Sequence, residues 1–144
     1  MSEWETIDVL NRLLAVHCYS LPVYMSVAHP VLRRGDEKTA ATIDQIAADQ
    51  QQTAERIAEM IRELEGRLDS GTFPTRFTHL HDLRIDYLLD LLIEFQRRDV
   101  QSIEAFIDQL QDAPLARSVA EEALGAAKGH LESLEELTAQ PAAS

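Results

Sequence analysis

The chain has 144 residues, of which 45% are hydrophobic and 26% charged, and its formal net charge is −12. This length suits one domain with its own core, and the single cysteine, Cys18, excludes an internal disulfide and a multi-cysteine metal site. The acidity argues against sequence-independent binding to nucleic acid or anionic lipid. Because no signal-peptide pattern and no long apolar run is seen, we expect a cytoplasmic protein that does not span a membrane.

The first predicted helix covers residues 5–28 and ends before Pro30, because a proline disfavours helical geometry in the residue that precedes it. Pro22 lies inside this helix and lacks a backbone donor, so we expect a kink or a local irregularity there. The turn that follows ends in Asp36, which can cap a second helix over residues 37–65.

Residues 66–76 form a predicted loop that is long enough either to cross the bundle or to make a compact turn. A third helix is expected over residues 78–110, with Thr78 as its cap, and a fourth over residues 114–138. The tail at residues 141–144 should be loose. No β pattern of useful length appears, so the predicted fold class is all-α.

Each predicted helix carries an apolar seam with a polar interruption near its middle. In the first helix the seam alternates steps of three and four residues, and His17 is its one strongly polar member. The second seam is polar at Gln50 and Thr53, which lie one turn apart, and the fourth is polar at His130. The third seam runs Leu80, Leu83, Tyr87, Leu91 and Glu94. Counting from the helix ends places these polar positions in one central layer of a four-helix bundle over residues 1–140, in which neighbouring helices are antiparallel.

This pattern resembles the ferritin-like superfamily, in particular its bacterioferritin and rubrerythrin branch, over nearly the whole chain. In that family two helices each give one Glu, and the other two each give a Glu-x-x-His pair, to a di-iron centre. His17 stands where the first Glu belongs, and Tyr24 matches a tyrosine that lies near the metals. Gln50 and Thr53 replace the Glu and His of the second-helix motif.

The remaining ligand positions complete the comparison. Ala127 and His130 correspond to the fourth-helix pair, and Glu94 corresponds to the third-helix Glu. The two bridging positions, Gln50 and Ala127, have lost their carboxylates, and the one that remains cannot neutralise two divalent cations. The resemblance therefore does not imply ferroxidase or oxygenase activity. Gln51 stands where heme-binding members have methionine, so heme is not implied either.

The sequence leaves two interpretations of the polar layer open. In the first, the layer and the Tyr24 hydroxyl satisfy one another by hydrogen bonds, and the chain is a non-catalytic binding or assembly protein without a cofactor. Such a protein is expected to act as a homodimer or with a protein partner. In the second, His17, Glu94 and His130 hold a single Zn or Fe ion with open positions for water, and the chain is a metalloprotein.

Overall fold

The computed structural model describes residues 1–28, 34–69, 71–80 and 85–139. This part of the chain contains no strand, which confirms the predicted all-α class, and none of its helices is long and apolar enough to cross a membrane. The predicted tail at residues 141–144 and Leu83 lie outside the described residues. The elements are α1 (Glu3–Cys18), α2 (Leu21–Ala28), α3 (Glu37–Glu63), the 3-10 turn η1 (Thr75–Leu80), α4 (Ile85–Gln109) and α5 (Pro114–Ala139).

The first predicted helix is in fact two helices, α1 and α2, with a break at Tyr19 and Ser20. Ser20 caps α2, because its hydroxyl oxygen accepts a hydrogen bond of 3.2 Å from the Val23 N–H. Pro22 then falls in the first turn of α2, where its missing N–H would have had no helical partner. The irregularity expected near Pro22 is therefore a complete interruption, about one turn past His17.

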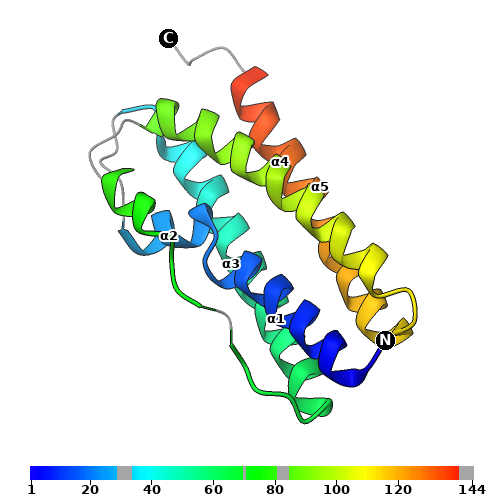
Figure 1. The fold of residues 1–144 in the computed structure, drawn as a ribbon. Coiled ribbons are helices and arrows are strands. Elements are labelled where there is room, and N and C mark those ends of the chain that lie inside the picture. Colours follow the sequence, from blue (N-terminus) through cyan, green and yellow to red (C-terminus); the bar gives the residue numbers. More distant parts are fainter. Residues whose placement is uncertain (29–33, 70, 81–84, 140–144) are drawn as a thin grey trace.

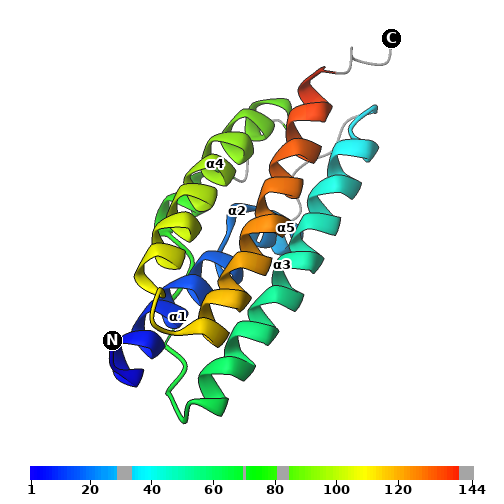
Figure 2. The ribbon, with the colours of Figure 1, turned by 90° about the vertical axis from the view of Figure 1, so that its right-hand side faces the viewer.

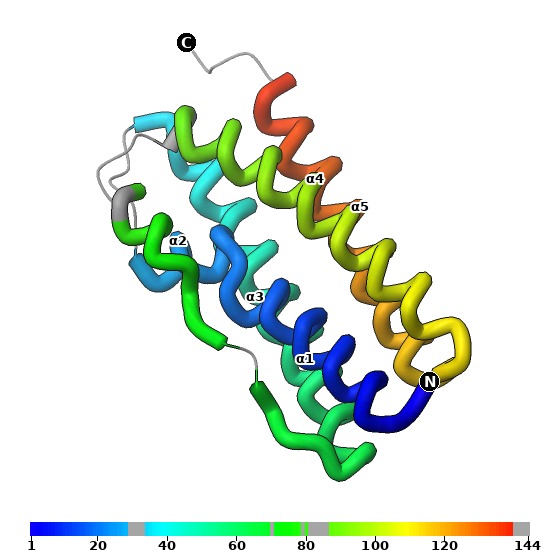
Figure 3. The backbone as a smooth tube through the Cα atoms, in the orientation of Figure 1, coloured from blue at the N-terminus to red at the C-terminus, as the bar shows by residue number. Residues whose placement is uncertain are grey.

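The helices α1, α3, α4 and α5 lie side by side along a common axis, and α2 lies beyond the end of α1 against α3 (Figures 1 and 2). Around the bundle, α1 neighbours α3, α3 neighbours α5, α5 neighbours α4, and α4 neighbours α1. Helices α1 and α5 run in one direction, and α3 and α4 run in the opposite direction. Helices that are neighbours around the bundle are therefore antiparallel. The connection after α3 runs back along the bundle through η1 (Figure 3), and it is therefore a crossover that makes α3 and α4 parallel.

Two apolar clusters fill the bundle. One lies between α1, the C-terminal halves of α3 and α4, and the N-terminal half of α5, and its fully buried members include Leu10, Leu13, Ile57, Ile61, Ile103 and Leu110. The other lies between α2, η1, the N-terminal halves of α3 and α4, and the end of α5, and it includes Leu21, Ile46, Leu88, Leu92 and Leu134. Burial of these side chains drives the association of the helices, at roughly 1.5–3 kcal/mol for each large one.

The end of α3 packs closely against α1. Glu65 has a left-handed backbone with a φ of 59°, its N–H donates to the Arg62 carbonyl, and the N–H of Gly66 donates to the carbonyl of Ile61. A Cβ added at Gly66 would lie only 2.8 Å from a branched methyl of Ile7 and 3.0 Å from one of Ile61. Gly66 is thus required for the close approach of α1, whereas the left-handed position at this helix end belongs to Glu65.

We expect Gly66→Ala to lower the free energy of unfolding by about 1–3 kcal/mol, because the β-branched neighbours cannot rotate away from the added methyl group. Gly129→Ala is the matched control, since a Cβ at this exposed position of α5 meets nothing within 4 Å. This control should gain up to about 1 kcal/mol from the better helix propensity of alanine. Urea unfolding monitored by circular dichroism measures both changes, and equal effects at the two positions would contradict the close approach.

Candidate functional site

A layer of polar side chains separates the two apolar clusters. On α3, for example, Gln50 lies between Ile46 of one cluster and Ala54 of the other. Four members of the layer are buried polar residues, none more than 6% exposed, and the others line a small cavity beside them. We call this set the polar layer, and it consists of His17, Ser20, Gln50, Thr53, Gln96, Asp99 and His130.

The Ser20 hydroxyl connects the break between α1 and α2 to the middle of α3. It donates a hydrogen bond of 2.5 Å to Gln50 Oε1, while its oxygen accepts from the Val23 N–H. Both Ser20 and Gln50 are buried, so neither could exchange this bond for water without opening the core. The bond therefore fixes where α2 begins relative to α3.

The third helix of the bundle contributes Gln96, and not Glu94, to the polar layer. Gln96 is 2% exposed and its side-chain amide donates a hydrogen bond of 3.1 Å to the Ala127 carbonyl on α5. The Glu94 side chain is 53% exposed and pairs with Arg98 one turn along α4, at 2.5 Å. The prediction that Glu94 faces the core is wrong.

The error in α4 has a simple geometric origin. The predicted seam began at Leu80, which belongs to η1 and not to α4, so its phase does not apply to the helix. Tyr87, a member of that seam, is 56% exposed, whereas Leu88 and Leu92 are buried. Each residue turns an α-helix by about 100°, so a one-residue shift moves a side chain from the core to the surface.

The His17 ring donates a hydrogen bond to the backbone of its own helix. Its Nδ1 lies 2.9 Å from the Leu13 carbonyl, and because a carbonyl can only accept, Nδ1 carries the proton. Burial lowers the pKa of His17, the bond to Leu13 opposes this shift, and the neighbouring His130 adds a smaller lowering contribution. The neutral ring therefore keeps the lone pair on Nε2.

His130 faces its hydrogen-bond partner with the opposite ring nitrogen. Its Nε2 lies 3.1 Å from a carboxylate oxygen of Asp49 on α3, so Nε2 donates. The other oxygen of Asp49 accepts from the Gln45 amide at 3.0 Å. The Nδ1 atom of His130 is buried and has no hydrogen-bond partner among the described residues. A buried nitrogen of this kind is costly unless water or a ligand reaches it.

Asp99 is the carboxyl group that lines the internal cavity, among the residues that the structure describes. Burial raises the pKa of Asp99 from 3.8 to about 7, so a large fraction of this side chain is protonated at neutral pH. Asp99 lines a common cavity with His17 and His130. The cavity has a volume of about 10 Å³, close to the smallest space that holds one water molecule.

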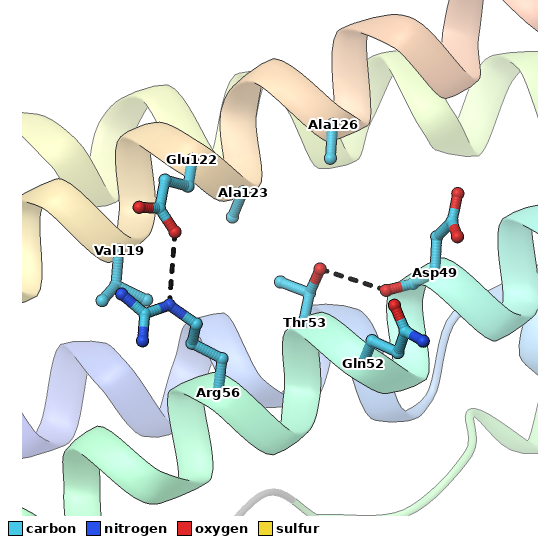
Figure 4. A pocket seen from close by; sticks show the side chains of 8 residues that line it. All are labelled: Asp49, Gln52, Thr53, Arg56, Val119, Glu122, Ala123 and Ala126. Atoms are coloured by element: carbon cyan, nitrogen blue, oxygen red, sulfur yellow. Dashed lines mark hydrogen bonds and ion pairs between the residues drawn. The ribbon is translucent and has the colours of Figure 1, made fainter.

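The polar layer reaches the surface through a groove between α3 and α5. Figure 4 shows Thr53 facing Ala123 and Ala126 across a groove of about 320 Å³. Thr53 and Ala126 line both this groove and the internal cavity. An exposed ion pair of 3.3 Å between Arg56 and Glu122 joins the two helices here, and such pairs contribute at most about 1 kcal/mol. The groove is therefore lined by both charged and small apolar side chains.

The structure places the remaining predicted residues as follows. His17, Gln50, Thr53 and His130 all line the cavity, as their seam positions predict. Tyr24 instead packs edge-on against Phe73, with 5.4 Å between the ring centroids, and belongs to an aromatic cluster rather than to the cavity lining.

The predicted ion site of His17, Glu94 and His130 is not assembled, because Glu94 points outward. Among the residues that the structure describes, no group of three His, Cys, Asp or Glu side chains is arranged to hold a metal ion.

Sequence reasoning missed Ser20, Gln96 and Asp99. A helix phase set by Ile103 and Leu110, instead of Leu80, would have brought Gln96 and Asp99 to the core side. Ser20 could have been found from the Ser-x-Pro order at Ser20 and Pro22, which is typical of a capped helix start.

No protein-family model matches this sequence, and no curated protein matches it.

Gln96→Ala and Glu94→Ala test the phase of α4. We expect Gln96→Ala to cost about 1–3 kcal/mol, because it removes a buried hydrogen bond and leaves a space in the core. Glu94→Ala should change the free energy of unfolding by less than about 0.5 kcal/mol, since its ion pair is exposed. Chemical denaturation measures the loss of stability in both variants. A larger loss in Glu94→Ala than in Gln96→Ala would mean that Glu94, and not Gln96, faces the core.

Asp99→Asn tests the buried carboxyl. Because its folded pKa of about 7 lies above the unfolded value, the wild type loses stability as the pH rises from about 4 to about 7. The variant has no carboxyl to ionise, so its stability relative to the wild type should increase over this interval and stay level above about pH 8. The contribution of His17 is common to both proteins and cancels in the difference. A difference that does not vary with pH would rule out the raised pKa.

Proposed function

We propose that this protein is a ferritin-like bundle without a di-iron centre, and that it acts as a non-catalytic binding or assembly protein. The crossover after α3 supports this proposal, because ferritin-like bundles contain one long crossover connection. The position of the polar layer in the middle of the bundle supports it as well, since this is where the family places its metals.

The observation that carries the proposal is the content of the layer. Its main polar contacts are hydrogen bonds within the protein, from Ser20 to Gln50, from Gln96 to the Ala127 carbonyl and from His130 to Asp49. The cavity that remains has the volume of about one water molecule. A di-iron centre uses several carboxylates, whereas Asp99 is the one carboxylate among the described residues that line this cavity. The layer is thus built to be satisfied without two metal ions.

A non-catalytic binding protein acts through its surface. The net charge of −12 favours a partner that carries positive charge and disfavours nucleic acid and anionic lipid. The protein would then act as a homodimer or in a complex with another protein. Its interface is expected to use exposed apolar side chains within this acidic surface.

A single metal ion held by His17 and His130, with Asp99 in place of Glu94, is the second candidate. It is favoured by one observation: each histidine donates one ring N–H to a protein acceptor, as histidine ligands of metals do, and the other nitrogen of His130 has no hydrogen-bond partner among the described residues. The three side chains are not arranged as a ligand set, so metal binding would require them to rotate. This second candidate predicts that the protein contains a bound metal ion, and the first predicts that it contains none.

Metal content decides between the two candidates. We expect protein purified without an affinity tag or chelator to contain less than stoichiometric Zn and Fe by mass spectrometry. His130→Ala should leave that content unchanged and lower the free energy of unfolding by about 1–3 kcal/mol, because it removes a largely buried ring together with its hydrogen bond to Asp49. Glu94→Ala is the control and should change neither quantity. A stoichiometric ion that disappears in His130→Ala would refute the proposal and establish the metalloprotein.

A further inference from the structure

A second groove, of about 440 Å³, opens at the end of the bundle where α1 and α5 begin and α3 ends. We call it the end groove. Much of its lining is apolar and includes Met1, Met60, Leu64, Pro114 and Leu115. Two of the three methionines of the chain lie here, and methionine side chains adapt readily to the shape of a bound partner.

Large apolar side chains are unusually exposed at this end of the molecule. Trp4 in the first turn of α1 is 78% exposed and Leu115 at the start of α5 is 74% exposed, the two highest values among the large apolar side chains described. Met1 is 47% exposed. Tryptophan and methionine are enriched in protein interfaces, and buried tryptophan often contributes a large share of binding energy. The described part of the chain leaves Trp4 and Leu115 largely open to solvent, so both side chains would gain from being covered by a partner.

The lining of the end groove also carries acidic side chains, at Glu3, Glu63 and Asp112. Glu3 lies in the first turn of α1, where the helix dipole stabilises a carboxylate, and Asp112 lies 3.9 Å from the Met1 amino group. The helix dipole does not favour the carboxylate of Glu63, because Glu63 is the last residue of α3 and the dipole disfavours negative charge at that end. Its position is instead favourable for a cation brought by a partner.

We propose that the end groove binds a cationic amphipathic segment of another protein, a helix or peptide whose apolar side chains are flanked by Lys or Arg. The apolar side would cover Leu115 and Met60, and the cationic side chains would pair with Glu63 and Glu3. This proposal names the partner class of the non-catalytic binding protein inferred above, and it rests on that function. A second copy of the chain fits less well, because two acidic end grooves would repel one another.

Trp4 is the only tryptophan of the chain and directly follows Glu3 of the groove lining in the first turn of α1, so its fluorescence reports on this end of the molecule. The probe is a synthetic amphipathic helix made of Leu and Lys, and a peptide of the same length made of Leu and Glu is its control. We expect the Leu/Lys peptide to bind saturably and to shift the Trp4 emission to shorter wavelength as water is excluded. The Leu/Glu peptide should do neither.

Paired variants locate the binding site. We expect Glu63→Lys and Leu115→Ser each to weaken binding of the Leu/Lys peptide about tenfold or more. Glu132→Lys near the other end of α5 and Val27→Ser on α2 change exposed residues by the same chemistry away from the end groove, and each should weaken binding less than twofold.

Three results would overturn the proposal. Equal weakening by Glu63→Lys and Glu132→Lys would mean that the peptide follows net charge and not this groove. Absence of saturable binding would mean that the groove does not recognise cationic segments. Concentration-dependent dimerisation abolished by Leu115→Ser would assign the groove to a second copy of the chain. None of these results depends on metal content, so failure of this inference is distinguishable from failure of the proposed function.

Discussion

The hydrogen bond between Ser20 and Gln50 is the contact on which the middle of this bundle depends. It joins the residue that begins α2 to the centre of α3, and both side chains are buried. Without it, the break after α1 would leave polar groups unpaired inside the core, at a cost of about 1–3 kcal/mol for each. The interruption of the first helix and the polar layer are therefore one feature, since Ser20 serves as the cap of α2 and as the partner of Gln50.

The polar layer gives little stability compared with an apolar core of the same shape, but it restricts how the helices can pack. Hydrogen bonds within the layer join α2 to α3 and α4 to α5, and the contact of His130 with Asp49 joins α5 to α3. A rotation or shift of α2, α3, α4 or α5 by one residue would separate at least one of these pairs. Buried polar groups of this kind can thus select a single arrangement among several that bury similar apolar area.

Much of this layer could be predicted from the sequence, because periodicity fixes which side of a helix faces the core. His17, Gln50, Thr53 and His130 each interrupt a long seam inside their helix, and the structure brings them to one cavity. Glu94 was misplaced because its seam started outside α4, where the phase is undefined. Pairing could not be predicted at all: whether Gln50 bonds to Ser20 or to a histidine depends on helix rotation and spacing, which periodicity does not determine.

We propose that the polar layer is held together by its own hydrogen bonds and not by a metal ion. A double-mutant cycle of Ser20→Ala and Gln50→Leu, measured by urea unfolding with and without a chelator, tests it most directly. We predict a coupling energy of about 1 kcal/mol between the two positions, with no effect of the chelator on wild-type stability. Additive changes, or a wild type that is destabilised when the chelator removes a bound ion, would contradict the account.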